Sequence, residues 1–152
     1  MNAARQLWLK AWLLCGTLDA LYATIVTFMR GGSIAETWLG AAAGPFGDSA
    51  QQWGVVGVLA GLAVHFAIMA GMVAAGLWLA RNSPFGDVAP WKAGTLYGLL
   101  LYSVMYGLVL QFRFGAPFPN PDRVKLAIGL LPHIFLVGIP LFILFRKTPP
   151  PS

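Results

Sequence analysis

Residues 54–80 read GVVGVLAGLAVHFAIMAGMVAAGLWLA, a run of 27 residues from which the fold class can be inferred. Its only ionisable side chain is the imidazole of His65. A mostly apolar run of about 18 residues or more crosses the ~30 Å hydrocarbon core of a bilayer as an α-helix, which rises about 1.5 Å per residue. The run therefore predicts a membrane-spanning helix with one titratable group near its middle.

The rest of the chain has the same character. Of its 152 residues, 58% are hydrophobic and 10% are charged, whereas a soluble domain carries about 25% charged residues. Charged residues bracket three further apolar segments, and the predicted spans cover residues 11–29, 54–80, 93–112 and 126–145. All six tryptophans lie near a predicted span edge, as in the aromatic belts of membrane proteins. We therefore expect an all-α membrane protein, a four-helix transmembrane bundle forming a single domain over residues 1–152.

The basic residues predict an orientation. Six of them lie at the N-terminus, between spans two and three, and at the C-terminus, while four lie on the opposite side. This excess favours both termini in the cytoplasm. Asp19 would interrupt the apolar core of a cleavable signal peptide, so the first segment is interpreted as a retained helix. Because the basic residues cluster at span ends, they predict membrane anchoring and no nucleic-acid partner.

The longest connection, between spans one and two, contains a helix start signal. Ser33 and Glu36 match a capping box, in which each side chain bonds the other residue's backbone N–H. An apolar face follows, and Gly44-Pro45 ends the pattern. The sequence predicts a short interfacial helix over residues 34–43. Two roles stay open for it, a lid over the bundle or a strap along the membrane surface.

Three ionisable residues lie near the middle of three different spans, Asp19, His65 and His133. A charge at the bilayer centre costs at least ~2.5–3.5 kcal/mol, so such residues usually face protein or water. Tyr102 of span three is expected at a similar depth. The predicted buried polar cluster therefore consists of Asp19, His65, Tyr102 and His133.

Glycines at helical spacing predict close helix packing around this cluster. Small residues four positions apart share a helix face and allow another helix to approach. The glycines in question are Gly57 and Gly61 in span two, Gly94 and Gly98 in span three, and Gly129 in span four.

Several chemistries fit such a cluster, and the sequence leaves them open. A carboxylate beside two imidazoles can relay protons. Two histidines on separate helices could ligate haem, line a quinone site, or bind zinc or copper with Asp19 and Cys15. Alternatively, Asp19 and one histidine form a neutralising pair that sets helix register. No nucleophile elbow, phosphate loop, His-Glu-x-x-His motif or acidic cluster indicates an enzyme.

The residues around the cluster carry a family resemblance. At Gly16-Thr17-Leu18-Asp19, Leu62-Ala63-Val64-His65-Phe66, Pro90-Trp91 and Pro132-His133 the chain resembles a family of small, uncharacterised four-span proteobacterial membrane proteins. The last three spans bear a fainter likeness to an enterobacterial inner-membrane family associated with acid resistance. The resemblance implies a bacterial inner-membrane location and no particular activity.

Two functional hypotheses follow from these observations. The first is a non-enzymatic accessory or assembly subunit that packs with other membrane subunits or with copies of itself. The alternative is an intramembrane proton, ion, haem or quinone site built from Asp19, His65 and His133. Chemistry on a lipid or isoprenoid substrate is a third, weaker interpretation.

Overall fold

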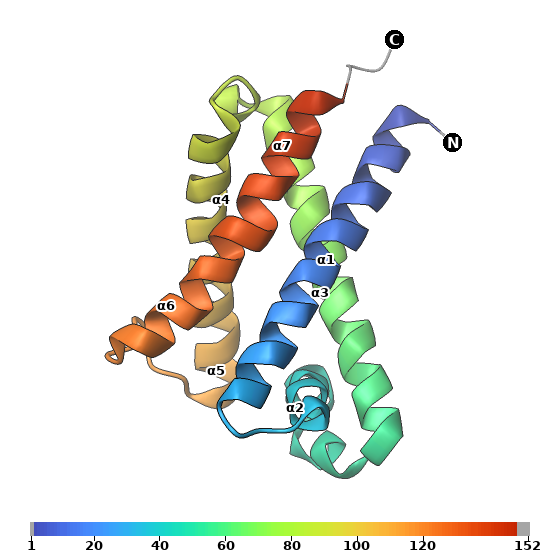
Figure 1. Cartoon of the computed structure of the whole chain (residues 1–152), viewed down its shortest axis with the longest axis vertical. Coiled ribbons are helices and arrows are strands. Elements are labelled where there is room, and N and C mark those ends of the chain that lie inside the picture. The colour runs from blue at the N-terminus through green and yellow to red at the C-terminus, as the bar shows by residue number, and fades with distance from the viewer. Residues whose placement is uncertain (1, 149–152) are drawn as a thin grey trace.

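The computed structural model describes residues 2–148, and four of its helices are long and apolar enough to cross a membrane. They run antiparallel in chain order, so that both termini lie at one end of the bundle (Figure 1). We call this the terminal end, and the opposite end the loop end. The four helices cover Ala3–Met29, Gly54–Asn82, Pro90–Phe114 and Arg123–Lys147. The predicted all-α four-helix architecture is thus confirmed.

The first and second spans are continuous helices, whereas the third and fourth each contain a π-helical segment. The first two are α1 (Ala3–Met29) and α3 (Gly54–Asn82). The third consists of α4 (Pro90–Val104), η3 (Met105–Val109) and α5 (Leu110–Phe114). The fourth consists of α6 (Arg123–Pro132), η4 (His133–Gly138) and α7 (Ile139–Lys147). Pro140 has no N–H for the carbonyl of residue 136, so the α-helical ladder is interrupted within η4.

The observed helices extend beyond the predicted spans. α1 begins at Ala3, eight residues before the predicted residue 11, and the side chain of Asn2 caps it by accepting the Arg5 N–H at 2.9 Å. The prediction ended each span near its bracketing charges. A charged side chain near a helix end reaches water while its backbone stays helical, so the charges do not mark the helix ends.

The connection between spans one and two forms α2 (Ile34–Phe46), followed by the 3₁₀-helix η1 (Asp48–Gln52). The capping box of Ser33 and Glu36 is present. The helix, however, continues through Gly44-Pro45 to Phe46, three residues beyond the predicted end. A second 3₁₀-helix, η2 (Pro84–Gly86), connects spans two and three at the terminal end.

The hydrophobic core occupies the half of the bundle near the terminal end. Its largest fully buried side chains are those of Cys15, Val73, Val137, Leu141 and Phe142. Glycines allow spans three and four to touch here. A Cβ added to Gly94 would lie 2.5 Å from the Cα of Ile139.

Helix α2 closes the loop end, where α1 and α3 diverge (Figure 1). Trp38 is 5% exposed, and Ala42 and Ala43 are fully buried. A Cβ added to Gly61 of α3 would collide with the backbone carbonyl of Trp38, and one added to Gly57 would lie 2.5 Å from a methyl group of Leu39. The glycine pair of span two therefore receives α2 rather than another spanning helix.

Candidate functional site

The half of the bundle near the loop end contains a cavity of about 800 Å³. Its walls come from α2, α3, η3 and α5, with residues of α1 and η4 at its inner surface. Most lining side chains are apolar or small. The polar lining residues are Asp19, His65, Tyr106, Arg113 and His133. All three ionisable residues predicted near the membrane centre thus line one cavity.

Asp19 of α1 and His65 of α3 form a close pair of ionisable groups. Nδ1 of His65 lies 3.9 Å from Oδ2 of Asp19, and the side chains are 13% and 21% exposed. Nε2 of His65 lies 2.9 Å from the carbonyl oxygen of Gly16. A carbonyl only accepts hydrogen bonds, so Nε2 carries the proton and donates. In the neutral ring Nδ1 is therefore bare and faces the carboxyl group.

The local sequence places His65 against α1. Gly16 has no side chain, and a Cβ there would lie 2.7 Å from the ring of Phe66. The indole N–H of Trp12 donates to the carbonyl of Phe66 at 2.8 Å, and Trp8 bonds the carbonyl of Ala70 at 3.4 Å. These contacts set the register of α1 against α3, and that register brings Asp19 to His65.

His133 is held by its own helix. Its Nδ1 lies 2.7 Å from the carbonyl oxygen of Gly129, four residues earlier. Nδ1 therefore donates, and Nε2 of the neutral ring is bare. The rings of Tyr102 and Tyr106 meet the imidazole edge-on, with centroids at 6.1 and 6.0 Å. Gly129 leaves room for Tyr106, because a Cβ there would lie 2.6 Å from its ring.

Tyr102 occupies a different position from the other three residues of the predicted cluster. Its hydroxyl group is buried and has no hydrogen-bond partner among residues 2–148. Its ring stacks on Tyr106 at 4.6 Å and approaches Phe118 at 5.8 Å. The tyrosine that lines the cavity is Tyr106, which lies in the π-helical segment η3.

Arg113 joins α5 to α2 at the edge of the cavity. Its Nε donates to the carbonyl of Gly44 at 2.9 Å, and its Nη2 donates to the carbonyl of Ala43 and to Oδ1 of Asp48, both at 2.7 Å. The Ala43 carbonyl also accepts the Gly47 N–H at 3.1 Å, and a cation beside the last carbonyls of a helix is favourable. Sequence reasoning treated Arg113 only as a charge at a span end. The one signal for this role is the helix end expected at Gly44-Pro45, on the same side of the membrane.

The geometry does not fit the metal and haem alternatives. No group of three or more His, Cys, Asp and Glu residues within residues 2–148 is arranged to hold a metal ion. Cys15 lies in the core, where its thiol approaches the carbonyl of Val137 at 3.6 Å. A haem held by two histidines needs two imidazoles with free nitrogens facing a flat space. Nε2 of His65 is engaged with Gly16, and its free Nδ1 faces Asp19.

The fold and the site define a small multi-pass α-helical membrane protein whose bundle contains a mostly apolar cavity with a few polar groups. Comparison of the chain with protein-family models, with curated proteins and with solved structures finds no match. Its function therefore has to be argued from the cavity.

Proposed function

We propose that the protein binds an isoprenoid quinol in this cavity, with the quinol ring held at the level of Asp19, His65 and His133. One observation carries the proposal: all three ionisable residues near the membrane centre line a single, otherwise mostly apolar cavity. Small-molecule sites are typically cavities of about 300–1,000 Å³ with apolar walls and a few convergent polar groups. The volume of about 800 Å³ falls within that range.

The hydrogen-bonding state of the polar groups favours the reduced form of the ligand. The Asp19 carboxyl group makes no hydrogen bond within residues 2–148, and in its ionised form it only accepts. Each neutral histidine already donates its one N–H to a backbone carbonyl, so its other nitrogen accepts as well. A quinol carries hydroxyl donors at two opposite ends of its ring, whereas a quinone carries only carbonyl acceptors. The quinol therefore complements the site, with one hydroxyl at Asp19 and His65 and the other at His133.

The outer part of the cavity suits an isoprenoid tail. Ile68 of α3 and Val109 and Phe114 of the third span line the cavity and are also 38–44% exposed at the bundle surface. We infer that the cavity opens sideways between α3 and the third span. In a membrane this opening faces lipid, into which an apolar tail can extend.

The proposed location is the bacterial inner membrane, with both termini in the cytoplasm. The six basic residues at the terminal end, against four at the loop end, support this orientation. It places α2 and Arg113 on the outer side of the membrane.

The direct test is binding of decyl-ubiquinol and decyl-ubiquinone to purified protein in nanodiscs, under anaerobic conditions. We expect tighter binding of the quinol, and weaker quinol binding in Asp19→Asn and His133→Phe. Losing a hydrogen bond to a charged group costs about 1.5–3 kcal/mol, or roughly tenfold or more in affinity. Equal affinity for both forms, or binding unaffected by both substitutions, would contradict the proposal.

Two alanines of α3 distinguish the effect of filling the cavity from the effect of adding a large side chain elsewhere on the same helix. Ala67 of α3 lines the cavity, whereas Ala75 is an exposed residue of the same helix outside it. Ala67→Phe is expected to block quinol binding, and Ala75→Phe to leave it intact. Thermal unfolding of both variants checks that each protein is folded.

The accessory-subunit hypothesis stays a prediction and is compatible with quinol binding. Purification in a mild detergent tests it through the proteins that accompany the chain. Isolation as a stable monomer without a partner would count against it.

A further inference from the structure

A second cavity, of about 490 Å³, lies at the terminal end between the ends of α1, α3, η2 and α7. It is separate from the quinol cavity, because the two have no lining residue in common. Its inner surface includes Leu7 and Ala80, which are 3% and 5% exposed, and the ring of Phe145. Arg81 of α3, Asp87, and Arg146 of α7 also line it. Both guanidinium groups lie at helix ends, which is the level of the lipid headgroups in a membrane. The apolar surface beside them lies at the level of the upper acyl chains.

The two arginines are available for a ligand. Arg146 donates from Nη1 to the carbonyl of Gly86 at 2.9 Å, which orients its guanidinium while leaving other N–H groups free. Arg81 is exposed and makes no hydrogen bond or ion pair within residues 2–148. Asp87 lines the same cavity but forms no ion pair with either arginine in the described part of the chain. Guanidinium groups recognise phosphate with paired, planar N–H donors.

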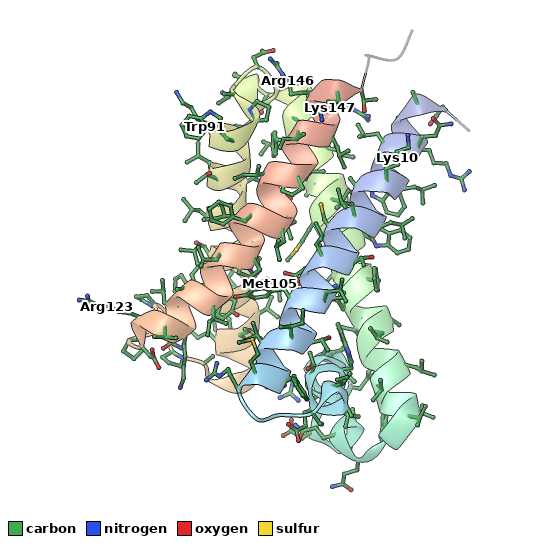
Figure 2. All side chains as sticks on the ribbon, in the orientation of Figure 1. Lys10, Trp91, Met105, Arg123, Arg146 and Lys147 are labelled. Atoms are coloured by element: carbon green, nitrogen blue, oxygen red, sulfur yellow. The ribbon has the colours of Figure 1, made fainter. Side chains whose placement is uncertain are left out.

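The charge around this cavity favours an anion. The terminal end carries six basic residues against Asp87 alone, a net charge of +5. The loop end carries four basic residues against Glu36, Asp48 and Asp122, a net charge of +1. Figure 2 shows Lys10, Arg146 and Lys147 at the terminal end and Arg123 at the opposite end. Basic pockets between transmembrane helices on the cytoplasmic side bind anionic lipid headgroups.

We propose that this cavity binds the headgroup of an anionic phospholipid with a hydroxylated headgroup, of the phosphatidylglycerol class. The phosphate lies between Arg81 and Arg146, and Asp87 accepts a hydrogen bond from a headgroup hydroxyl. The apolar surface at Leu7, Ala80 and Phe145 contacts the glycerol and upper acyl carbons. The site is independent of quinol binding, and each proposal can fail without the other.

The test is native mass spectrometry of delipidated protein with an equimolar mixture of phosphatidylglycerol, phosphatidylcholine and phosphatidylethanolamine. We expect preferential retention of phosphatidylglycerol, reduced about tenfold in Arg81→Gln because a charge-assisted hydrogen bond is lost. The matched control Arg123→Gln removes one positive charge from the loop end and should retain the preference. Arg81 is exposed and unpartnered, so its substitution leaves the fold intact, as thermal unfolding will verify.

Four results would overturn the proposal. Equal retention of the three lipids would show that the site is not selective. An equal loss of phosphatidylglycerol retention in Arg81→Gln and Arg123→Gln would show that only the overall positive charge matters. Preferential retention of phosphatidylethanolamine would assign the site to a zwitterion held by Arg81 and Asp87. Inorganic phosphate is added alone in a parallel sample. Stabilisation by phosphate together with displacement of the lipid would identify free phosphate as the ligand.

Discussion

The two halves of the bundle are built from the same four helices but differ in how they are filled. Near the terminal end, side chains such as Val73, Leu141 and Phe142 are fully buried in a core to which all four spans contribute. Near the loop end, the spans diverge, α2 closes the end, and a cavity of about 800 Å³ remains inside. One half therefore provides tertiary stability, and the other keeps a space into which Asp19, His65 and His133 project.

The difference follows from side-chain volume at the helix contacts. In the packed half, Gly94 and Gly138 bring two backbones together, and large apolar side chains fill the neighbouring layers. In the other half, the lining residues of α2 include Gly40, Ala41 and Gly44, which are too small to fill the space beside α3. Proteins place binding sites where packing is incomplete at a cost in stability, and the loop half matches that pattern.

Removing a large side chain from each half tests this contrast. The substitution in the packed half should have the largest effect on the free energy of unfolding. Phe142→Ala opens a void in the packed half and should lower the free energy of unfolding by about 2–4 kcal/mol. In a bilayer most of this loss comes from lost van der Waals packing. The hydrophobic transfer contribution is small, because lipid is as apolar as the protein core. Met105→Ala enlarges an existing cavity and should cost less than ~1 kcal/mol. Denaturation in mixed micelles measures both; equal losses would show that the two halves are equally packed.

Substitutions of Gly61 and Gly71, two glycines of α3, test whether α2 is docked against the bundle. Gly61→Ala places a methyl group against the backbone carbonyl of Trp38, and overpacking of this kind costs about 1–3 kcal/mol. Gly71→Ala meets no atom within 4 Å and should be neutral or stabilise the helix by up to ~1 kcal/mol. Thermal unfolding of the two variants gives the comparison. A Gly61→Ala protein as stable as Gly71→Ala would mean that α2 is not docked as described.

Arg113 is expected to hold the C-terminal part of α2 in place. Its side chain is 31% exposed, so the loss in Arg113→Gln should be about 1 kcal/mol, below the range for buried charged hydrogen bonds. Accessibility is the more sensitive measurement. A cysteine introduced by Ala41→Cys should react faster with a maleimide when Arg113 is replaced. Cys15 is fully buried and adds little background. Arg123→Gln is the control, and an unchanged rate in Arg113→Gln would exclude this role.

Two tyrosine hydroxyls should give the smallest and most specific contrast. Tyr22 donates to the carbonyl of Ile128 at 3.0 Å, and that carbonyl lacks its helical N–H partner because Pro132 has none. Tyr22→Phe should therefore cost about 0.5–1.5 kcal/mol. The hydroxyl of Tyr102 is buried without a partner in the described chain. Tyr102→Phe should thus be neutral or slightly stabilising, and a larger loss there than in Tyr22→Phe would reverse the assignment.

The candidate site shows where sequence reasoning reached its limit. Asp19, His65 and His133 stood out because an ionisable group within an apolar span is costly, which a sequence shows directly. Tyr102 was grouped with them by depth and helical spacing. The structure places Tyr106 on the cavity wall instead. Tyr106 lies in the π-helical segment η3, and no local sequence signal marks that segment.

Arg113 illustrates the same limit at longer range. Its partners, Ala43, Gly44 and Asp48, lie 65–70 residues earlier in the chain. The sequence shows a basic residue at a span end and a helix end near Pro45. It does not show that the two meet.

The four spans, the capping box of α2 and the three ionisable residues near the middle of their spans can be recognised in the sequence without a structure. These features depend on hydrophobic length, local hydrogen bonding and the cost of burying charge, all of which are properties of short segments. Three other features become visible only in the folded chain: α2 docks on Gly61, Arg113 binds the end of α2, and the three ionisable residues share one cavity. Glycines occur on several helix faces, so many pairings satisfy the local pattern, and side-chain volume at the contacts selects among them.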